Sequence, residues 1–275
     1  MNEQKVVWVT GASSGLGLHT ALAYRDAGWK VIAGARSFID IRGEDDGMVK
    51  LPLDVTNEDS IHDFVTEACK YADHVDVLVQ CAGMLVLGSC EETSVGEFEK
   101  VIMTNYLGMV RVNRQALPVM RRQGYGRIVL FSSINGLMGI PFQSAYTASK
   151  HAIEGYAECL QMEAKPFNIE VMIVEPGDHR SGSEKYRPEA AAMNEESPYF
   201  DEYRSAVQQI HHDENNGSDP DHLGKCIVKA TGRKKLPYRL RVASPDQHLA
   251  VWIHKFLPAR LNAEILRKYY IRKKD

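Results

Sequence analysis

The chain has 275 residues, of which 44% are hydrophobic and 25% are charged, and its formal net charge is −3 at pH 7. A chain of this length and composition can bury one large core, which excludes a disordered or fibrous protein and requires no second domain. The weakly negative charge and the pI of about 6.4 provide no general attraction to nucleic acid or anionic lipid, so no nucleic-acid partner is expected.

The cysteine and histidine content excludes further classes of protein. The five cysteines are widely spaced and include no Cys-x-x-Cys pair, which argues against a disulfide framework and against a structural zinc site. The ten histidines form no convincing metal-binding set. No secretory signal precedes the first apolar run, and the most apolar stretch, residues 75–87, is interrupted by polar residues and too short to span a bilayer. We expect a cytoplasmic protein with no metal and no membrane span.

Short apolar runs rich in β-branched residues alternate with helix-length segments along most of the chain. The predicted strands cover residues 6–10, 30–35, 49–53, 75–79, 127–131, 169–174 and 238–242. Several runs are almost continuously apolar, as expected for strands buried on both faces of a parallel sheet. The pattern predicts one α/β domain over residues 1–275, with a Rossmann-like, doubly wound parallel sheet of about seven strands and helices on both faces.

Two segments in the second half of the chain interrupt this alternation. Residues 178–219 form a polar excursion that is typical of a substrate lid, with one or two helices and with His211-His212 in a solvated loop. Residues 245–275 form a helical extension, in which Pro258 opens the second of two amphipathic helices. Such helices usually pack on their own core or on a second subunit, and a homodimer or homotetramer is expected. Attachment to a membrane surface is the alternative, because the end of the chain is basic.

The first predicted strand leads into the run Thr10-Gly11-Ala12-Ser13-Ser14-Gly15-Leu16-Gly17. Glycines at a strand-to-helix junction allow a tight turn and a close approach of the backbone to a pyrophosphate. The first amides of the next helix then stabilise the negative charge. This turn predicts a dinucleotide site.

A second pattern carries acid–base chemistry. Tyr146 and Lys150 are one helical turn apart, so the ammonium group can lie beside the phenol and is expected to lower its pKa toward neutrality. Ser133, a short loop upstream, can hold a substrate oxygen next to the phenol. This set suits the interconversion of a carbonyl and an alcohol.

The spacing Thr-Gly-x-x-x-Gly-x-Gly, together with Tyr146-x-x-x-Lys150 and Ser133, resembles the short-chain dehydrogenase/reductase family from Val6 to about Ser181. Gly34-Ala35-Arg36 and the extended C-terminus are similar to its retinol- and hydroxysteroid-dehydrogenase-like members. The resemblance implies four catalytic residues, namely Asn105, Ser133, Tyr146 and Lys150, with Asn105 completing a proton relay. It implies a cofactor site made of Gly11, Ser13, Ser14, Gly15, Leu16, Gly17, Asp54, Val55, Ala82, Gly83, Tyr146, Lys150, Pro176, Gly177 and Ser181.

The sequence departs from the family pattern in one turn. Gln80-Cys81-Ala82-Gly83 stands where the family usually has Asn-Asn-Ala-Gly, so the side-chain support of that turn is in question. This departure is the one feature that favours the alternative function, a non-catalytic NADP(H)-binding protein that senses redox state and regulates a partner.

The end of the second strand indicates which cofactor is bound. An NAD-binding enzyme usually has an acidic residue there, which would repel a 2′-phosphate. Here Ala35 removes the repulsion, Arg36 provides a planar cation, and Ser37 adds a donor, so NADP(H) is favoured over NAD(H).

The substrate is predicted to be an apolar ketone or alcohol, and the Asp178-His179-Arg180 insert with the charged excursion after it also leaves room for a more polar compound. Apolar side chains cluster after strand ends and before Tyr146, where a pocket over the nicotinamide would lie. They are Met84, Leu85, Leu87, Leu137, Met138, Ile140 and Phe142, and about half of them are expected to be core residues.

Overall fold

The computed structural model of the protein describes residues 4–182, 185 and 187–271. Its centre is an eight-stranded sheet with the order β3-β4-β2-β1-β5-β6-β7-β8. The strands are β1 (Val6–Thr10), β2 (Lys30–Ala35), β3 (Gly43–Asp45), β4 (Met48–Pro52), β5 (Val77–Gln80), β6 (Gly126–Phe131), β7 (Ile169–Pro176) and β8 (Arg239–Val242). All neighbouring pairs are parallel except β3 with β4. The predicted fold class is confirmed, and the sheet has one strand more than expected.

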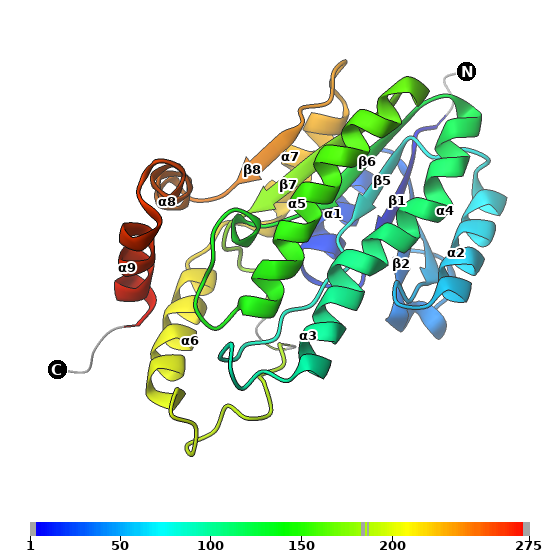
Figure 1. The fold of residues 1–275 in the computed structure, drawn as a ribbon. Helices are drawn as coiled ribbons and strands as arrows, with labels where there is room; N and C mark the ends of the chain where they lie inside the picture. The colour runs from blue at the N-terminus through cyan, green and yellow to red at the C-terminus, as the bar shows by residue number, and fades with distance from the viewer. Residues whose placement is uncertain (1–3, 183–184, 186, 272–275) are drawn as a thin grey trace.

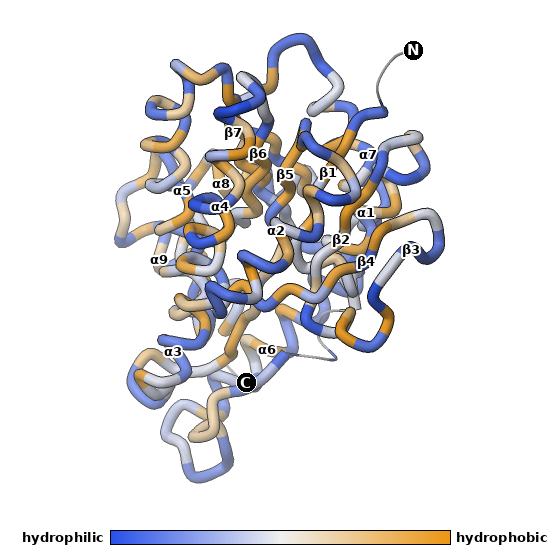
Figure 2. Tube along the Cα trace, turned by 90° about the vertical axis from the view of Figure 1, so that its right-hand side faces the viewer, coloured by the Kyte–Doolittle hydropathy of each residue, from blue (hydrophilic) through white to orange (hydrophobic). Residues whose placement is uncertain are grey.

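The central strands β1 and β5 are buried over their whole length, and β2, β6 and β7 are buried at all but one position each, as their continuous apolar runs predict. The hydropathy-coloured trace shows them as hydrophobic segments in the middle of the molecule (Figure 2). The additional strand, β3, is a polar three-residue segment at the sheet edge that pairs antiparallel with β4 through Glu44 and Val49. Its residues have no strand pattern of their own, so only its pairing with β4 defines it as a strand.

Helices cover both faces of the sheet (Figure 1). On one face, α2 (Glu58–Tyr71), α4 (Gly108–Gln123) and α5 (Ser144–Ala164) pack on a core that includes Trp8 and Ile128. On the other face, α1 (Gly15–Asp26) and α7 (Pro220–Thr231) pack on a second core that includes Val9 and Val129. This is the doubly wound arrangement that the alternating pattern predicts.

The chain beyond β7 builds a third apolar cluster at one end of the sheet. It contributes α6 (Phe200–Asn215), α8 (Pro245–Phe256) and α9 (Ala259–Tyr270), and α8 and α9 stand apart from the sheet in the view of Figure 1. Tyr203, Ile210, Val251 and Tyr270 from these helices join Phe142 in the cluster. None of the helices in the described ranges is long and apolar enough to cross a membrane.

The prediction of a solvated loop at His211-His212 is wrong, because both residues lie in α6. Tyr203, Ala206 and Ile210 are spaced three and four residues apart and are buried on one side of the helix. This apolar stripe stabilises the helix despite the polar residues around it.

Candidate active site

The predicted site residues meet where the parallel strands end. The carboxyl ends of β1, β2, β4, β5, β6 and β7 lie at one edge of the sheet, since their registers align, as in the pairing of Thr10 with both Gly34 and Gln80. A crevice at this edge is where open α/β sheets bind ligands. The structure thus brings together the glycine turn, Arg36, Asp54, Ala82 and Ser133.

The glycine turn has the geometry of a phosphate cradle. Gly11 has a φ of 68°, and a Cβ there would lie 2.7 Å from the backbone of Ala82, so only glycine fits. A Cβ on Gly17 would lie 2.1 Å from the carbonyl oxygen of Gly11. Ser14 is the N-cap of α1 but makes no side-chain cap hydrogen bond, which leaves the first helical amides open to an anion. These features fit a dinucleotide pyrophosphate.

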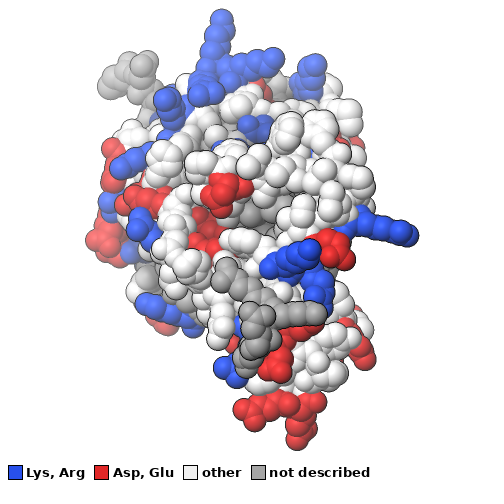
Figure 3. Space-filling model, turned by 90° about the vertical axis from the view of Figure 1, so that its left-hand side faces the viewer, with Lys and Arg blue, Asp and Glu red and all other residues white. Residues whose placement is uncertain are grey.

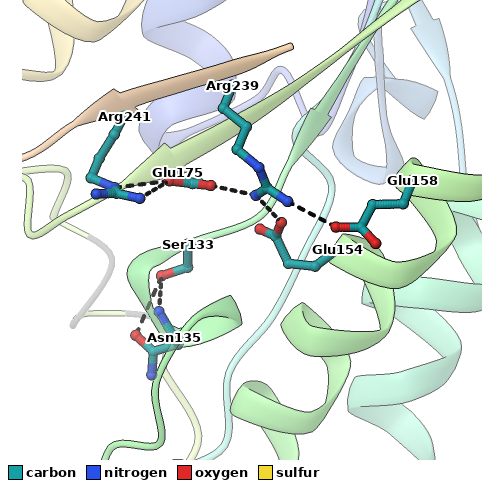
Figure 4. Close-up of polar contacts among 7 residues, drawn as sticks. All are labelled: Ser133, Asn135, Glu154, Glu158, Glu175, Arg239 and Arg241. Carbon is teal, nitrogen blue, oxygen red and sulfur yellow. Dashed lines mark hydrogen bonds and ion pairs between the residues drawn. The ribbon is translucent and has the colours of Figure 1, made fainter. Parts of the chain in front are cut away.

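Ser133 is positioned by Asn135, a residue that was not predicted to belong to the site. Its Oγ accepts a hydrogen bond from the backbone N of Asn135 (3.2 Å) and donates to Asn135 Oδ1 (3.3 Å), as Figure 4 shows. Asn135 in turn donates to Gln143 Oε1 (2.8 Å), and all three residues are buried. The hydroxyl also hydrogen-bonds with Tyr146. Asn135 and Gln143 therefore position the serine.

Tyr146 and Lys150 lie on one side of α5, and the Lys150 Nζ is 5.3 Å from the centre of the Tyr146 ring. The expected lowering of the phenol pKa is wrong for this structure. Burial raises the pKa of Tyr146 to about 12, and the Ser133 hydrogen bond offsets only part of that effect. Lys150 donates to Phe131 O (2.6 Å), and burial lowers the pKa of its own ammonium group to about 8.

Asn105 lies in a π-helical turn, η2 (Met103–Leu107), between α3 (Val95–Ile102) and α4. Its side-chain Oδ1 accepts from Met84 N (2.7 Å), and its Nδ2 donates to Met84 O (2.8 Å) and to Ser149 Oγ (2.9 Å). The amide thereby links the segment after β5 to α5. A π-turn of this kind often marks a functional site within a helix.

The departure at Gln80 is compensated in part by residues of α4 and α5, although Gln80 Oε1 is buried without a hydrogen-bond partner among the described residues. Gln80 Nε2 donates to Asn113 Oδ1 (2.6 Å), and Asn113 donates to the hydroxyl of Tyr156 (3.2 Å). The turn itself is bound by a hydrogen bond from Ala82 N to Thr10 Oγ1 (3.4 Å). Cys81 is a partly buried thiol whose pKa burial raises strongly, which does not suit a nucleophile.

Arg36 and Asp54 lie at the predicted adenosine end of the crevice. Arg36 is exposed and opens the short helix η1 (Arg36–Ile39) after β2, with exposed Ser37 beside it. Asp54 accepts hydrogen bonds from the amide and hydroxyl of Thr56 (2.9 and 2.7 Å). Burial acts to raise the Asp54 pKa, but these bonds and the Arg36 charge lower it overall. Val55 follows as a buried residue.

The predicted nicotinamide end of the crevice follows β7. The nearest atom to a Cβ on Gly15 would be Ser181 Cβ, at 4.0 Å, so Ser181 faces the glycine turn. Glu175, just before Pro176-Gly177, is completely buried and binds Arg239 (2.6 Å) and Arg241 (2.7 and 2.8 Å) from β8. Figure 4 shows these ion pairs close to Ser133. They fix the end of β7 against the sheet edge.

A charged group beside Tyr146 was not predicted. Arg187 pairs with Glu214 of α6 (2.5 Å), and their side chains are 7% and 16% exposed. Asp178 follows Gly177, and both it and Glu214 act electrostatically on Tyr146. The surface that carries α6, α8 and α9 shows charges of both signs between uncharged areas (Figure 3). No sequence spacing connects these residues, because they come from separate segments.

The predicted substrate-pocket residues divide into two groups. Leu87, Met138, Ile140 and Phe142 are buried in the third apolar cluster, and Met84, Leu85 and Leu137 are only partly buried against it. A groove of about 670 Å³ runs between the loop before α5 and α9, and its lining includes Ile140, Pro141 and Leu266. Tyr146 does not line this groove. All five cysteines are free thiols, and the described residues contain no cluster of potential metal ligands.

Comparison with known proteins shows the family that this chain matches. The family model described as short chain dehydrogenase matches residues 5–191. The 3-ketodihydrosphingosine reductase of Bacteroides thetaiotaomicron is 35% identical over 269 residues, which cover 98% of each chain. Retinol dehydrogenase 8 of Bos taurus is 33% identical over 256 residues, which cover 86% of this chain and 81% of the relative. The crystal structure of a short-chain dehydrogenase from Streptomyces avermitilis superimposes with a TM-score of 0.80 at 33% identity, covering 98% of this chain and 97% of the other.

Proposed function

Because this chain belongs to the short-chain dehydrogenase/reductase family and is an oxidoreductase acting on a carbonyl/alcohol pair, we propose that it reduces a long-chain apolar ketone with NADPH. The observation that carries the proposal is the placement of Ser133, Tyr146 and Lys150 beside the glycine turn at one edge of the sheet. This arrangement supports the reaction type.

Tyr146 is the proposed proton donor. With a pKa of about 12, its phenol is protonated at neutral pH, which is the form needed for reduction. Ser133 lies beside the phenol, and its single hydroxyl proton, which points to Asn135 Oδ1 in this structure, would turn to the substrate oxygen while its Oγ still accepts from Asn135 N. When bound, NADPH supplies a hydride to the carbonyl carbon. Tyr146 then gives its proton to the oxygen, and the products are the alcohol and NADP⁺.

Lys150 and Asn105 restore the proton. Lys150 is buried, and its ammonium charge stabilises the phenolate that remains after proton transfer. We propose that Asn105 keeps the relay from solvent to Lys150 in place, because its side chain binds both the backbone of Met84 and Ser149, the neighbour of Lys150. Tyr146 and Lys150 also bind the cofactor ribose in this proposal.

The preference for NADPH rests on Arg36. Its guanidinium group is exposed at the end of β2, the position where a 2′-phosphate would lie, and its charge already acts on Asp54 across the adenosine end of the crevice. Buried Ala35 provides no competing carboxylate. The amides that open α1 would hold the pyrophosphate, with Ser13 and Ser14 exposed beside them.

The substrate class is inferred from the apolar cluster and from the relatives. The loop before α5 and the helices after β7 form an apolar cluster that includes Ile134 and Ala145, the sequence neighbours of Ser133 and Tyr146, and Ile140 belongs both to that cluster and to the groove of about 670 Å³. The relative that matches over 98% of both chains is named for a long-chain keto substrate. Retinoids and steroids, the substrates suggested by the sequence resemblance, are the competing class.

The test is NADPH oxidation with a panel of long-chain ketones, retinal and ketosteroids. Replacement of Tyr146 by Phe keeps the ring and removes the proton, and it is expected to lower kcat by about 10²- to 10⁴-fold. Binding of NADPH, followed by its fluorescence, should weaken much less than kcat falls, because Lys150 and the glycine turn still hold the cofactor. Full activity in Tyr146→Phe on any accepted ketone would refute the assignment of the acid.

A further inference from the structure

Asp178 occupies an unusual place for a carboxylate. It directly follows the Pro176-Gly177 turn, is largely buried, and is close enough to Tyr146 for its charge to act on the phenol. Its neighbour Gly177 is covered by Gln247 of α8, whose Oε1 would lie 1.9 Å from a Cβ on Gly177. Asp178 therefore connects the end of β7, where its charge acts on Tyr146, to Gln247 of α8.

The hydrogen bonds of Asp178 leave part of its charge unmatched. Its backbone N donates to Gln247 Oε1 (3.2 Å), and its Oδ2 accepts a hydrogen bond from Gln247 Nε2. Gln247 is neutral, and among the described residues no hydrogen bond to Asp178 Oδ1 is found. One carboxylate oxygen is thus available to a ligand.

The charges around Asp178 favour the binding of a cation to its carboxylate. Glu214 and Asp213 lie near Asp178, and the nearby cation Arg187 is already paired with Glu214. Burial and these two acids raise the pKa of Asp178 to about 7, since a second negative charge is unfavourable there. A ligand that carries a positive charge would relieve this repulsion and would favour the ionised form.

We propose that Asp178 binds an ammonium group on the carbon next to the reacting carbonyl, so that the enzyme selects long-chain 2-amino ketones. This inference rests on the proposed function and specifies its substrate class. In a 2-amino ketone, two carbons separate the nitrogen from the oxygen that Tyr146 and Ser133 bind, so the nitrogen would lie within the region where the charge of Asp178 acts on the phenol. The substrate named for the Bacteroides thetaiotaomicron relative, 3-ketodihydrosphingosine, is an amino ketone of this kind with a long alkyl chain.

The experiment compares two ketones in the full-length protein with NADPH. One is 3-ketodihydrosphingosine, and the other is the same molecule with hydrogen in place of the amino group. We expect the wild type to have a kcat/KM at least about tenfold higher for the amino ketone, because a charge-assisted hydrogen bond distinguishes the two. The difference should lie mainly in KM, since Asp178 binds the ammonium group in both the ground state and the transition state.

Asp178→Asn preserves the shape and the acceptor for Gln247 but removes the charge. It should lower kcat/KM for the amino ketone by about 10- to 100-fold and leave the value for the deaminated ketone within about twofold. Asp213→Asn is the matched control, because Asp213 is an acid near Asp178 that instead bonds to Gln209 and Tyr269. It should retain the preference for the amino ketone.

The outcomes separate the two claims. If the wild type reduces both ketones equally well, or if Asp178→Asn slows both by the same factor, the ammonium site is refuted while the reductase function stands. Equal kcat/KM values of the wild type for the two ketones would refute the ammonium site even if Asp178→Asn did not fold. If the wild type reduces neither of these ketones nor any other in the panel, the proposed function fails and the ammonium site fails with it.

Discussion

Asp178 should make the stability of the protein depend on pH in a way that Asp178→Asn removes. The pKa of this carboxyl is about 7 in the folded protein and close to 3.8 when the chain is unfolded. The folded state therefore binds the proton more tightly, and stability is lost as pH rises from about 4 to about 7. The groups that face Asp178 and contribute to this effect are Asp213, Glu214, Arg187, Gln247, Tyr146 and Tyr270.

The size of the effect follows from the two pKa values. Between pH 5 and about pH 7 the folded state holds one proton on Asp178 that the unfolded state has released. Over this range of about 2 pH units, the free energy of unfolding of the wild type should therefore fall by about 3 kcal/mol. For a chain of 275 residues, an unfolding entropy of about 0.6 kcal/mol per kelvin converts this to about 5 °C in Tm.

The assay is thermal unfolding of wild type and Asp178→Asn, without added ligand, at pH 5 and at pH 8. The Tm of the variant minus that of the wild type should be about 5 °C larger at pH 8. A Tm difference that is equal at the two pH values would show that folding does not raise the pKa of Asp178. A Tm difference that is smaller at pH 8 would show that folding lowers this pKa instead.

Three other predictions test the remaining parts of the site. With a pKa of about 8 for Lys150, kcat/KM for ketone reduction should fall as pH rises above about 8, since the charged lysine is the active form; a flat profile to pH 10 would contradict this. Arg36→Ala should lower kcat/KM for NADPH by about 10- to 100-fold and change the value for NADH by less than about threefold, and equal losses with both cofactors would contradict a phosphate contact. Glu175→Gln should destabilise the protein by about 3 kcal/mol in urea unfolding, because it removes the buried carboxylate that Arg239 and Arg241 share and leaves Arg241 without it. Glu158→Gln, at the exposed end of the same group, should cost less than about 1 kcal/mol, and similar losses in both variants would remove the distinction.

The parts of the fold that could be predicted are those encoded in contiguous segments. The inner strands and the glycine turn are local patterns, and the long apolar runs predict their burial. Strand β3 could not be predicted, because Glu44 and Asp45 pair with β4 without any apolar period. The histidine pair in α6 was misassigned because the polar residues obscured the apolar stripe through Tyr203 and Ile210.

The site residues that could be predicted are likewise those that lie close together in the sequence. Ser133, Tyr146 and Lys150 are linked by short spacings, whereas Asp178, Glu214 and Gln247 meet only through the folding of distant segments. The direction of the Tyr146 pKa shift was wrong because spacing reveals a neighbouring cation but does not reveal how deeply the phenol is buried.

The two hydrogen bonds between Gln247 and Asp178 couple the packing of α8 to the protonation state of Asp178. An ionised carboxylate accepts a hydrogen bond more strongly than a neutral carboxyl group, so ionisation of Asp178 strengthens its bond to α8. By reciprocity, the docking of α8 favours the ionised carboxylate. Amide hydrogen exchange along α8 should therefore report, from outside the crevice, whether the catalytic centre carries that negative charge.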